Sequence, residues 1–193
     1  MPIEYITNQK EFMKKLFYVD ENVLIPRQDT EILVEEVIKI AETKTTSNQT
    51  IINNNLQILD MCTGSGAIAV SLASYIDKSE IDAVDISQKA LEITEKNAKE
   101  NKVEKKIKEI ESNLYKNIGE KKYDIIVSNP PYIKHEVIKK LDKQVQKEPL
   151  IALDGGDDGL EFYRKIIKQS PKYLKKDGYL CLEIGYDQKD EVI

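Results

Sequence analysis

Short apolar runs alternate with segments of helical periodicity along most of the chain, and this alternation constrains the fold more than any other feature. β-Branched, apolar runs predict strands over residues 56–61, 81–85, 106–110, 123–128 and 179–184. Apolar residues at helical spacing predict helices over residues 66–75, 87–101 and from 158 or 159 to 170. Such an alternation forms right-handed βαβ units. The sequence therefore predicts an α/β fold with a doubly wound, mostly parallel sheet.

The segment before the first of these strands has a different pattern. Residues 4–23 mix short apolar runs with polar breaks, which is typical of a hairpin or an extended arm. Asp29 is a good N-cap for a helix whose apolar stripe consists of Ile32, Leu33, Val37, Ile40 and Ala41. Residues 42–55 are rich in Thr, Asn and Lys and predict a polar surface loop.

The end of the chain and its cysteines add three expectations. Residues 188–193 are expected to begin a helix, and the strand at 179–184 is expected at the edge of a sheet truncated at its C-terminal strands. No apolar run reaches the length of a membrane span, and the first residues lack a signal-peptide pattern. Two cysteines, Cys62 and Cys181, are too few for a disulfide framework and are interpreted as reduced thiols of a cytoplasmic protein.

The overall charge argues against one class of partner. With a formal net charge of -5, the chain lacks the basic character of proteins that bind nucleic acid by bulk electrostatics. Basic runs at residues 139–147 and 172–176 are typical of solvated faces, and a local patch for a polyanionic partner stays open. We therefore expect no direct sequence-specific binding of nucleic acid.

Residues 60–66 join the first strand of the alternation to its first helix. Glycines here allow a ligand to approach the backbone, and the helix N-terminus offers unpaired N–H groups. Residues 64–69 also fit a loose G-x-G-x-x-A dinucleotide pattern. The carboxylate of Asp60 would crowd a pyrophosphate but suits a cationic amino-acid ligand. The alternative is a glycine turn that only permits strand–helix packing.

Asp85 ends the second strand of the alternation, about twenty residues past the glycines, where an acidic residue binds ribose hydroxyls. The alternative is a solvated carboxylate at the end of a strand. Ligands of parallel sheets sit at the carboxyl ends of the strands. Asp60, Asp85 and Asn129 are all expected at that edge.

Asn129-Pro130-Pro131-Tyr132, here called the lip, follows the fourth strand. Prolines fix φ and have no backbone N–H, so their carbonyls stay free to accept hydrogen bonds. Asn129 adds a side-chain oxygen. Two acceptors beside a flat ring suit a planar NH2 group, so we interpret the lip as holding an amide or exocyclic amine. The alternative is a turn that only ends the strand.

Two other features carry weaker signals. Residues 148–159 begin with an extended Glu-Pro step and end in a Gly-Gly-Asp-Asp-Gly turn, which indicates either an ordered functional loop beside the lip or an ordinary connector. His135 is the only histidine, and its charged neighbours are typical of a solvated surface. Nothing nearby has the spacing of metal ligands, so we expect no metal site.

Five blocks of the sequence closely resemble protein-(glutamine-N5) methyltransferases of the HemK/PrmC family. The blocks are residues 5–7 with 11–13, 24–31, 60–66, 129–133 and 148–159, and they follow the family's order. The lip is shared with enzymes that methylate amino groups of DNA and RNA. The Ile-Pro-Arg-x-Asp-Thr-Glu block and the Glu-Pro…Gly-Gly block are more particular to this family. Cys62 departs from the glycine of many members.

The resemblance implies a Rossmann-like fold that depends on S-adenosylmethionine and releases S-adenosylhomocysteine. It implies methylation of the glutamine in the Gly-Gly-Gln motif of class I peptide chain release factors during translation termination. Residues 1–29 would then be a linker or hairpin segment and residues 30–193 the methyltransferase catalytic domain. By this resemblance we expect the given sequence to lack the family's N-terminal helical domain and the last two strands of its sheet.

The resemblance also assigns site residues. It makes Asn129, Pro130 and Tyr132 catalytic. Cofactor contacts fall on Asp60, Cys62, Thr63, Gly64, Ser65, Gly66, Asp85, Asn113, Leu114 and Asn129. Substrate contacts fall on Arg27, Asn129, Pro130, Pro131, Tyr132, Ile133, Glu148 and Pro149.

Three alternatives remain open. An N-methyltransferase of exocyclic amines in DNA or RNA would share the lip, but it needs a basic tract and a base-stacking surface. A nicotinamide-dependent oxidoreductase is suggested only by the loose glycine pattern. A non-catalytic remnant would bind the cofactor and turn over protein substrate poorly.

Overall fold

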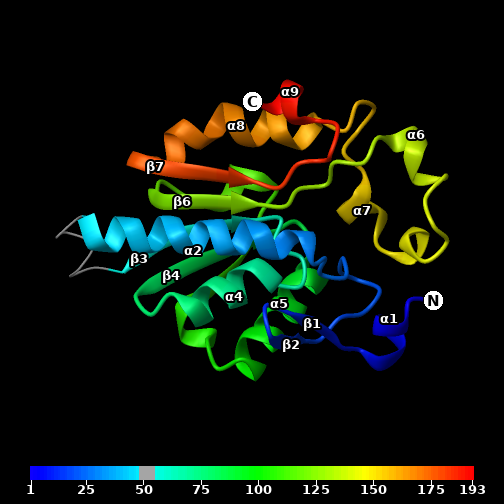
Figure 1. The fold of residues 1–193 in the computed structure, drawn as a ribbon, viewed down its shortest axis with the longest axis horizontal. Helices are drawn as coiled ribbons and strands as arrows, with labels where there is room; N and C mark the ends of the chain where they lie inside the picture. The colour runs from blue at the N-terminus through cyan, green and yellow to red at the C-terminus, as the bar shows by residue number, and fades with distance from the viewer. Residues whose placement is uncertain (48–54) are drawn as a thin grey trace.

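The computed structural model describes residues 1–47 and 55–193 (Figure 1). Its elements in chain order are α1 (Ile3–Thr7), β1 (Lys10–Phe12), β2 (Lys15–Phe17), α2 (Asp29–Ser47), β3 (Leu56–Met61), α4 (Ala67–Tyr75), β4 (Ser79–Asp85), α5 (Gln88–Glu100), η1 (Glu104–Lys106), β5 (Ile107–Glu111), η2 (Leu114–Asn117), β6 (Tyr123–Ser128), α6 (His135–Ile138), η3 (Val145–Lys147), α7 (Leu150–Leu153), α8 (Glu161–Tyr173), β7 (Leu174–Leu182) and α9 (Lys189–Val192).

Five parallel strands form the main sheet in the order β5-β4-β3-β6-β7. The predicted doubly wound parallel sheet is therefore confirmed, and β7 lies at its edge among the described strands. Asp60 of β3 pairs with Ala83 of β4 and Val127 of β6. The carboxyl ends of these strands consequently meet at one end of the sheet, beyond which the segment containing α6 and α7 extends (Figure 1).

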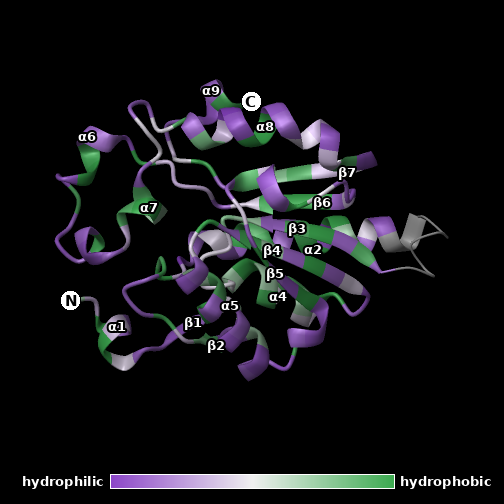
Figure 2. Cartoon of the chain, turned by 180° about the vertical axis from the view of Figure 1, so that it is seen from behind, coloured by the Kyte–Doolittle hydropathy of each residue, from purple (hydrophilic) through white to green (hydrophobic). Residues whose placement is uncertain are grey.

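The apolar strands supply both faces of the sheet. Along β6, Ile125 packs in the cluster with α2 and α4, whereas Ile126 packs in the cluster that includes Ile166 of α8. Ile58 and Leu59 of β3 divide in the same way. Side chains of period two thus bury opposite faces of the central strands. Figure 2 colours each residue of these strands by its hydropathy.

The segment before α2 contains a short helix and a hairpin. β1 and β2 pair antiparallel. Of the two arrangements expected for this segment, a hairpin or an extended arm, the hairpin is confirmed. Phe12 and Phe17 bury their rings in the core beside α2 and α4. The five-residue helix α1 was not predicted, and the Tyr5 hydroxyl anchors it by donating to the carbonyl of Val23 at 2.6 Å.

Helix α2 corrects two expectations. The helix continues to Ser47, so the loop expected at 42–55 is wrong for residues 42–47, and residues 48–54 lie outside the described part. Ile32 of the expected stripe is 63% exposed, whereas Val34 is fully buried. The polar composition hid this continuation, because a helix that packs one face on a sheet accepts polar residues elsewhere.

The C-terminal elements begin at different residues from those expected. Helix α8 starts at Glu161 rather than at 158 or 159. Strand β7 starts at Leu174, and its register with β6 shifts before Tyr179, where the expected strand begins. Helix α9 confirms the short helix expected after residue 188. Among the described residues, no helix has the length and apolarity needed to cross a membrane.

Candidate active site

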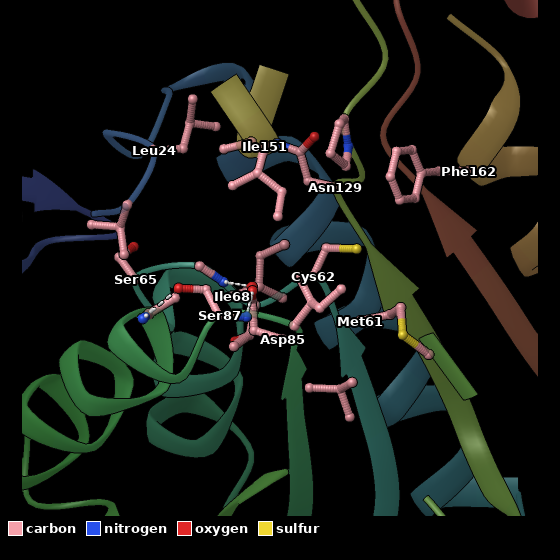
Figure 3. A pocket seen from close by; sticks show the side chains of 18 of the residues that line it. Leu24, Met61, Cys62, Ser65, Ile68, Asp85, Ser87, Asn129, Ile151 and Phe162 are labelled. Atoms are coloured by element: carbon pink, nitrogen blue, oxygen red, sulfur yellow. Dashed lines mark hydrogen bonds between the residues drawn. The ribbon is translucent and has the colours of Figure 1, made fainter. Parts of the chain in front are cut away.

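A cavity of about 330 Å³ opens at the carboxyl ends of the strands (Figure 3). Its volume falls at the lower end of the range for small-molecule sites, roughly 300–1,000 Å³. Ten expected site residues line it, namely Arg27, Cys62, Thr63, Gly64, Ser65, Asp85, Asn113, Leu114, Asn129 and Pro131. Seven others do not line it, namely Asp60, Gly66, Pro130, Tyr132, Ile133, Glu148 and Pro149.

Sequence reasoning missed the apolar wall of this cavity. Leu24 from the segment before α2, Ile151 of α7 and Phe162 of α8 contribute side chains to it (Figure 3). Each resembles an ordinary apolar residue of its own segment, so no local pattern marks it. Because the three segments meet only in the folded chain, this wall required the structure.

The turn between β3 and α4 brings its backbone against α5. Gly66 has φ +77°, and a Cβ there would lie 2.8 Å from Cγ2 and 3.2 Å from Cα of Thr94. Glycine is therefore required by both conformation and space. Gly64 has φ +57° and nothing within 4 Å of a Cβ, which leaves its cavity side open. Cys62 has φ +62°, a conformation that favours the glycine seen in many members of the resembling family.

Polar side chains of α5 fix this turn. Thr94 Oγ1 donates to the carbonyl of Gly64 at 3.1 Å, and Asn97 Nδ2 donates to that of Ser65 at 2.8 Å. Asn97 also accepts from the backbone N–H of Tyr18 at 2.7 Å and donates to its carbonyl at 3.0 Å. Asn97 therefore joins the glycine turn to the hairpin segment. Its only sequence signal is a polar residue inside an apolar helical stripe.

Asp60 lies beneath the turn and is fully buried. Its Oδ2 accepts from Thr63 Oγ1 at 2.6 Å and from the N–H of Ala69 at 3.1 Å. Among the described residues, none donates to its Oδ1. Burial raises the pKa of Asp60 to about 7, against the lowering effect of these two hydrogen bonds. The carboxyl is thus poised to ionise when a cation approaches the turn.

Asp85 lines the cavity at the end of β4 (Figure 3). Its Oδ2 accepts from the N–H of Gly64 and its Oδ1 from that of Ser87, both at 2.9 Å. Burial raises the pKa of Asp85, and these N–H groups lower it. Each carboxylate oxygen keeps a second lone pair for a ligand hydroxyl.

The lip stands at the opposite wall of the cavity. Asn129 Nδ2 donates to Thr30 Oγ1 at 3.2 Å. In the described part of the chain no residue donates to Asn129 Oδ1 or to the carbonyl of Pro130. Of these two oxygens, only that of Asn129 belongs to a residue that lines the cavity, because Pro130 is buried and does not line it.

The Gly-Gly-Asp-Asp-Gly turn packs directly on the lip. A Cβ on Gly155 would lie 2.7 Å from Cα of Tyr132, and one on Gly159 would lie 2.4 Å from its carbonyl oxygen. Ile133 exchanges backbone hydrogen bonds with this segment, to Leu153 at 3.0 Å and from Gly155 at 2.9 Å. The segment 148–159, which includes α7, therefore packs in order against the lip, and whether it is functional or an ordinary connector stays a prediction.

A carboxyl group that sequence reasoning missed lies behind the lip. Glu183 follows β7, and its Oε1 is 3.5 Å from the hydroxyl of Tyr132. No described residue forms a hydrogen bond with its buried Oε2. Burial raises the pKa of Glu183, whereas contacts with Thr30, Tyr132 and Asn129 lower it. Its position at the end of a strand was the only available signal.

Arg27, which lines the cavity, pairs with the buried Glu148, which does not, and Arg27 Nη2 lies 2.5 Å from Glu148 Oε1. His135 is exposed and its Nδ1 lies 2.7 Å from Oδ2 of Asp154, so the ring is paired at the surface rather than simply solvated. Within residues 1–47 and 55–193, no three His, Cys, Asp or Glu side chains gather as metal ligands.

Two proteins similar to this chain carry the same name. A release factor glutamine methyltransferase from Clostridium acetobutylicum is 45% identical over 195 residues, which cover 100% of this chain and 65% of that protein. One of the same name from Clostridium botulinum is 43% identical and is covered over 66% of its length. The chain thus spans just under two thirds of these relatives. They confirm the resemblance found in the five sequence blocks.

Two further comparisons concern the fold and the family. The hMettl16 catalytic domain in complex with MAT2A 3'UTR hairpin 6 superposes with a TM-score of 0.65 at 16% identity, covering 96% of this chain and 76% of that one. This likeness shows the Rossmann-like fold of methyltransferases. The family model of the methyltransferase small domain matches residues 43–150. The chain therefore belongs to the methyltransferase small domain family.

Proposed function

We propose that this chain transfers a methyl group from S-adenosylmethionine to the side-chain amide nitrogen of the glutamine in the Gly-Gly-Gln motif of class I peptide chain release factors. The observation that carries the proposal is the free Oδ1 of Asn129 beside a cavity of cofactor size. The names of the relatives support the protein substrate. A release factor as partner places the reaction in the cytoplasm.

The residues present fit an adenosyl cofactor that carries an amino acid. Asp60 does not line the cavity, but its carboxyl lies under the glycine turn with an unpaired Oδ1, so it suits an ammonium group held at that turn by charge rather than by direct contact. Asp85 at the end of β4 suits ribose hydroxyls, and the apolar wall with Leu114 suits a base. When bound, the cofactor supplies an electrophilic methyl group on a sulfonium that departs as a neutral thioether.

The lip aligns and activates the acceptor nitrogen. An amide nitrogen is a poor nucleophile because its lone pair is delocalised into the carbonyl. In our proposal Asn129 Oδ1 and the carbonyl of Pro130 accept its two N–H bonds, which orients the nitrogen and stabilises the positive charge that develops on it. Tyr132 packs against the amide plane. One proton leaves to water after the N–C bond forms, so no dedicated base is needed.

The test uses a purified class I release factor and a methyl-labelled donor. Incorporation of label into the wild-type release factor, and none into a variant with Gly-Gly-Ala in place of Gly-Gly-Gln, is the expected result. Asn129→Ala should lower the single-turnover rate by about 10²–10³-fold with little change in affinity for S-adenosylhomocysteine. Equal labelling of both release factors would overturn the proposed substrate.

A second candidate is methylation of an exocyclic amine in RNA. It is favoured by one observation, the fold shared with a domain whose structure was solved with an RNA hairpin. The net charge of -5 argues against it. Incubation of the same labelled donor with RNA in place of the release factor separates the two candidates.

A further inference from the structure

We propose that Thr30 and Glu183 are positioning residues. They fix which end of the Asn129 side-chain amide, its oxygen or its NH2 group, points at the glutamine amide that receives the methyl group. This inference rests on the proposed function, because it concerns the oxygen that receives the glutamine amide. It assigns Asn129 a hydrogen-bonded chain that runs away from the cavity, through the Thr30 hydroxyl, to the Glu183 carboxylate.

Three separate elements bring these groups together. Thr30 stands in the first turn of α2 and is 4% exposed. Asn129 follows β6, and Glu183 follows β7 next to it. The N–H of Glu183 donates to the carbonyl of Ser128 at 3.0 Å, and the Tyr163 hydroxyl donates to the carbonyl of Glu183 at 2.9 Å. The backbone of Glu183 is therefore held on both sides, and its side chain is confined behind the lip.

The chemistry of the groups gives the chain one direction. Asn129 Nδ2 donates to Thr30 Oγ1 at 3.2 Å. A hydroxyl has one proton to donate, and a carboxylate only accepts. The Tyr132 hydroxyl lies 3.5 Å from Glu183 Oε1, and no described residue forms a hydrogen bond with the buried Oε2. That oxygen is therefore the free acceptor behind the lip, where Thr30 and Asn129 are among the neighbours that stabilise the ionised carboxyl. With Glu183 ionised, the Thr30 proton is directed to the carboxylate, and Thr30 Oγ1 is left to accept from the Asn129 amide.

This direction matters because the two ends of an asparagine amide have nearly the same shape and opposite chemistry. If the Asn129 side-chain amide rotated by half a turn, its NH2 group would face the N–H bonds of the substrate glutamine, and donors would meet donors. A neutral donor in place of Glu183 would let the Thr30 proton turn toward Asn129 and permit that rotation. The charge of a residue outside the cavity thus selects the oxygen of a residue inside it.

Two observations describe the charges around Glu183. Asp29 on α2 acts to raise the pKa of Glu183, and none of the ion pairs within 4.0 Å in the described part of the chain includes this carboxyl. The neighbouring hydroxyl and amide groups of Thr30, Tyr132 and Asn129 are the ones that stabilise its ionised form. Loss of the Thr30 hydroxyl therefore removes a partner of both Asn129 and Glu183.

Three variants test the inference in the full chain: Thr30→Val, Thr30→Ser and Glu183→Gln. Val keeps the size of Thr and lacks the hydroxyl. We expect Thr30→Val and Glu183→Gln to lower kcat for release factor methylation at least tenfold, with the affinity for S-adenosylhomocysteine and the KM for release factor within twofold of wild type. Thr30→Ser should recover most of the rate. Glu35→Gln, an exposed change on the same helix, is the control for loss of a charge.

A second readout does not depend on turnover. The side-chain NH2 protons of Asn129, followed by NMR in the complex with S-adenosylhomocysteine, should exchange slowly with solvent in wild type and Thr30→Ser and at least tenfold faster in Thr30→Val. Unchanged exchange, or wild-type kcat in Thr30→Val or Glu183→Gln, overturns the inference. So does a parallel loss of cofactor affinity and melting temperature. If wild type methylates no release factor, the proposed function fails first, and the exchange experiment still decides the hydrogen-bond chain.

Discussion

Arg27 and Glu148 lie 121 residues apart in sequence, yet Nη2 of the arginine is 2.5 Å from Oε1 of the glutamate. The other carboxylate oxygen of Glu148 accepts from the N–H of Ile25 at 3.0 Å. These residues belong to the two sequence blocks that are most particular to the resembling family. Their spacing in sequence concealed that they are one structural unit, which joins the segment before α2 to the loop that packs on the lip.

Removal of the arginine alone should cost more stability than removal of both charges. The Glu148 side chain is 2% exposed and that of Arg27 is 38% exposed, so Arg27→Met leaves a buried carboxylate whose one remaining donor, among the described residues, is the N–H of Ile25. We expect the free energy of unfolding in urea to fall by about 1–3 kcal/mol, the cost of leaving a buried acceptor unsatisfied. The double variant Arg27→Met/Glu148→Gln should recover part of this loss, because a neutral amide oxygen still accepts from Ile25. A double variant less stable than Arg27→Met would contradict this account.

Gly159 and Gly119 offer a matched pair of glycines at positive φ. Their φ angles are +76° and +70°, but a Cβ would meet the carbonyl of Tyr132 at 2.4 Å in the first and nothing within 4 Å in the second. Gly119→Ala should therefore cost about 1 kcal/mol for its conformation alone. Gly159→Ala should cost about 1–3 kcal/mol more, because the lip must shift. Urea denaturation of both variants decides the point, and equal losses would show that the contact with the lip is unimportant.

The strands were the most predictable part of the fold. β3 and β6 have the expected bounds because each is an apolar run buried on both faces, a pattern that belongs to central parallel strands. The continuation of α2 to Ser47 was not predictable, because its polar residues are equally compatible with a surface loop and with an exposed helix. The early start of β7 depends on a shift of register against β6, which only the neighbouring strand determines.

Some residues of the candidate site were also predictable from the sequence, and others were not. The glycine turn, Asp85 and Asn129 were found because each follows a predictable strand. Thr30 and Glu183 were not found, since one lies in the first turn of a helix and the other follows the edge strand, and their positions behind the lip depend on the order of the strands in the sheet. Asp60 was expected among the cofactor contacts, but the structure places it under the turn and outside the cavity lining.

Asp85 should control the affinity for the cofactor by binding the hydroxyls of its ribose. In our proposal its two oxygens, each already accepting one N–H at 2.9 Å, also accept from ribose hydroxyls. Asp85→Ala should weaken binding of S-adenosylhomocysteine at least tenfold by calorimetry, since a charge-assisted hydrogen bond contributes about 1.5–3 kcal/mol. An analogue that lacks both ribose hydroxyls is the control, because it should bind wild type and variant nearly equally. Equal loss for both ligands would assign Asp85 only to shaping the glycine turn.

The protonation of Asp60 should make stability depend on pH. Burial raises its pKa from 3.8 to about 7 in the folded chain, so the folded state holds a proton that the unfolded state releases between these values. The contribution of this group is therefore fully present below pH 3.8 and is lost as the pH rises toward about 7. Asp60→Asn keeps an uncharged acceptor for Thr63 and removes the titration. The stability of this variant relative to wild type, measured by urea denaturation, should rise between pH 5 and pH 7 and then level off.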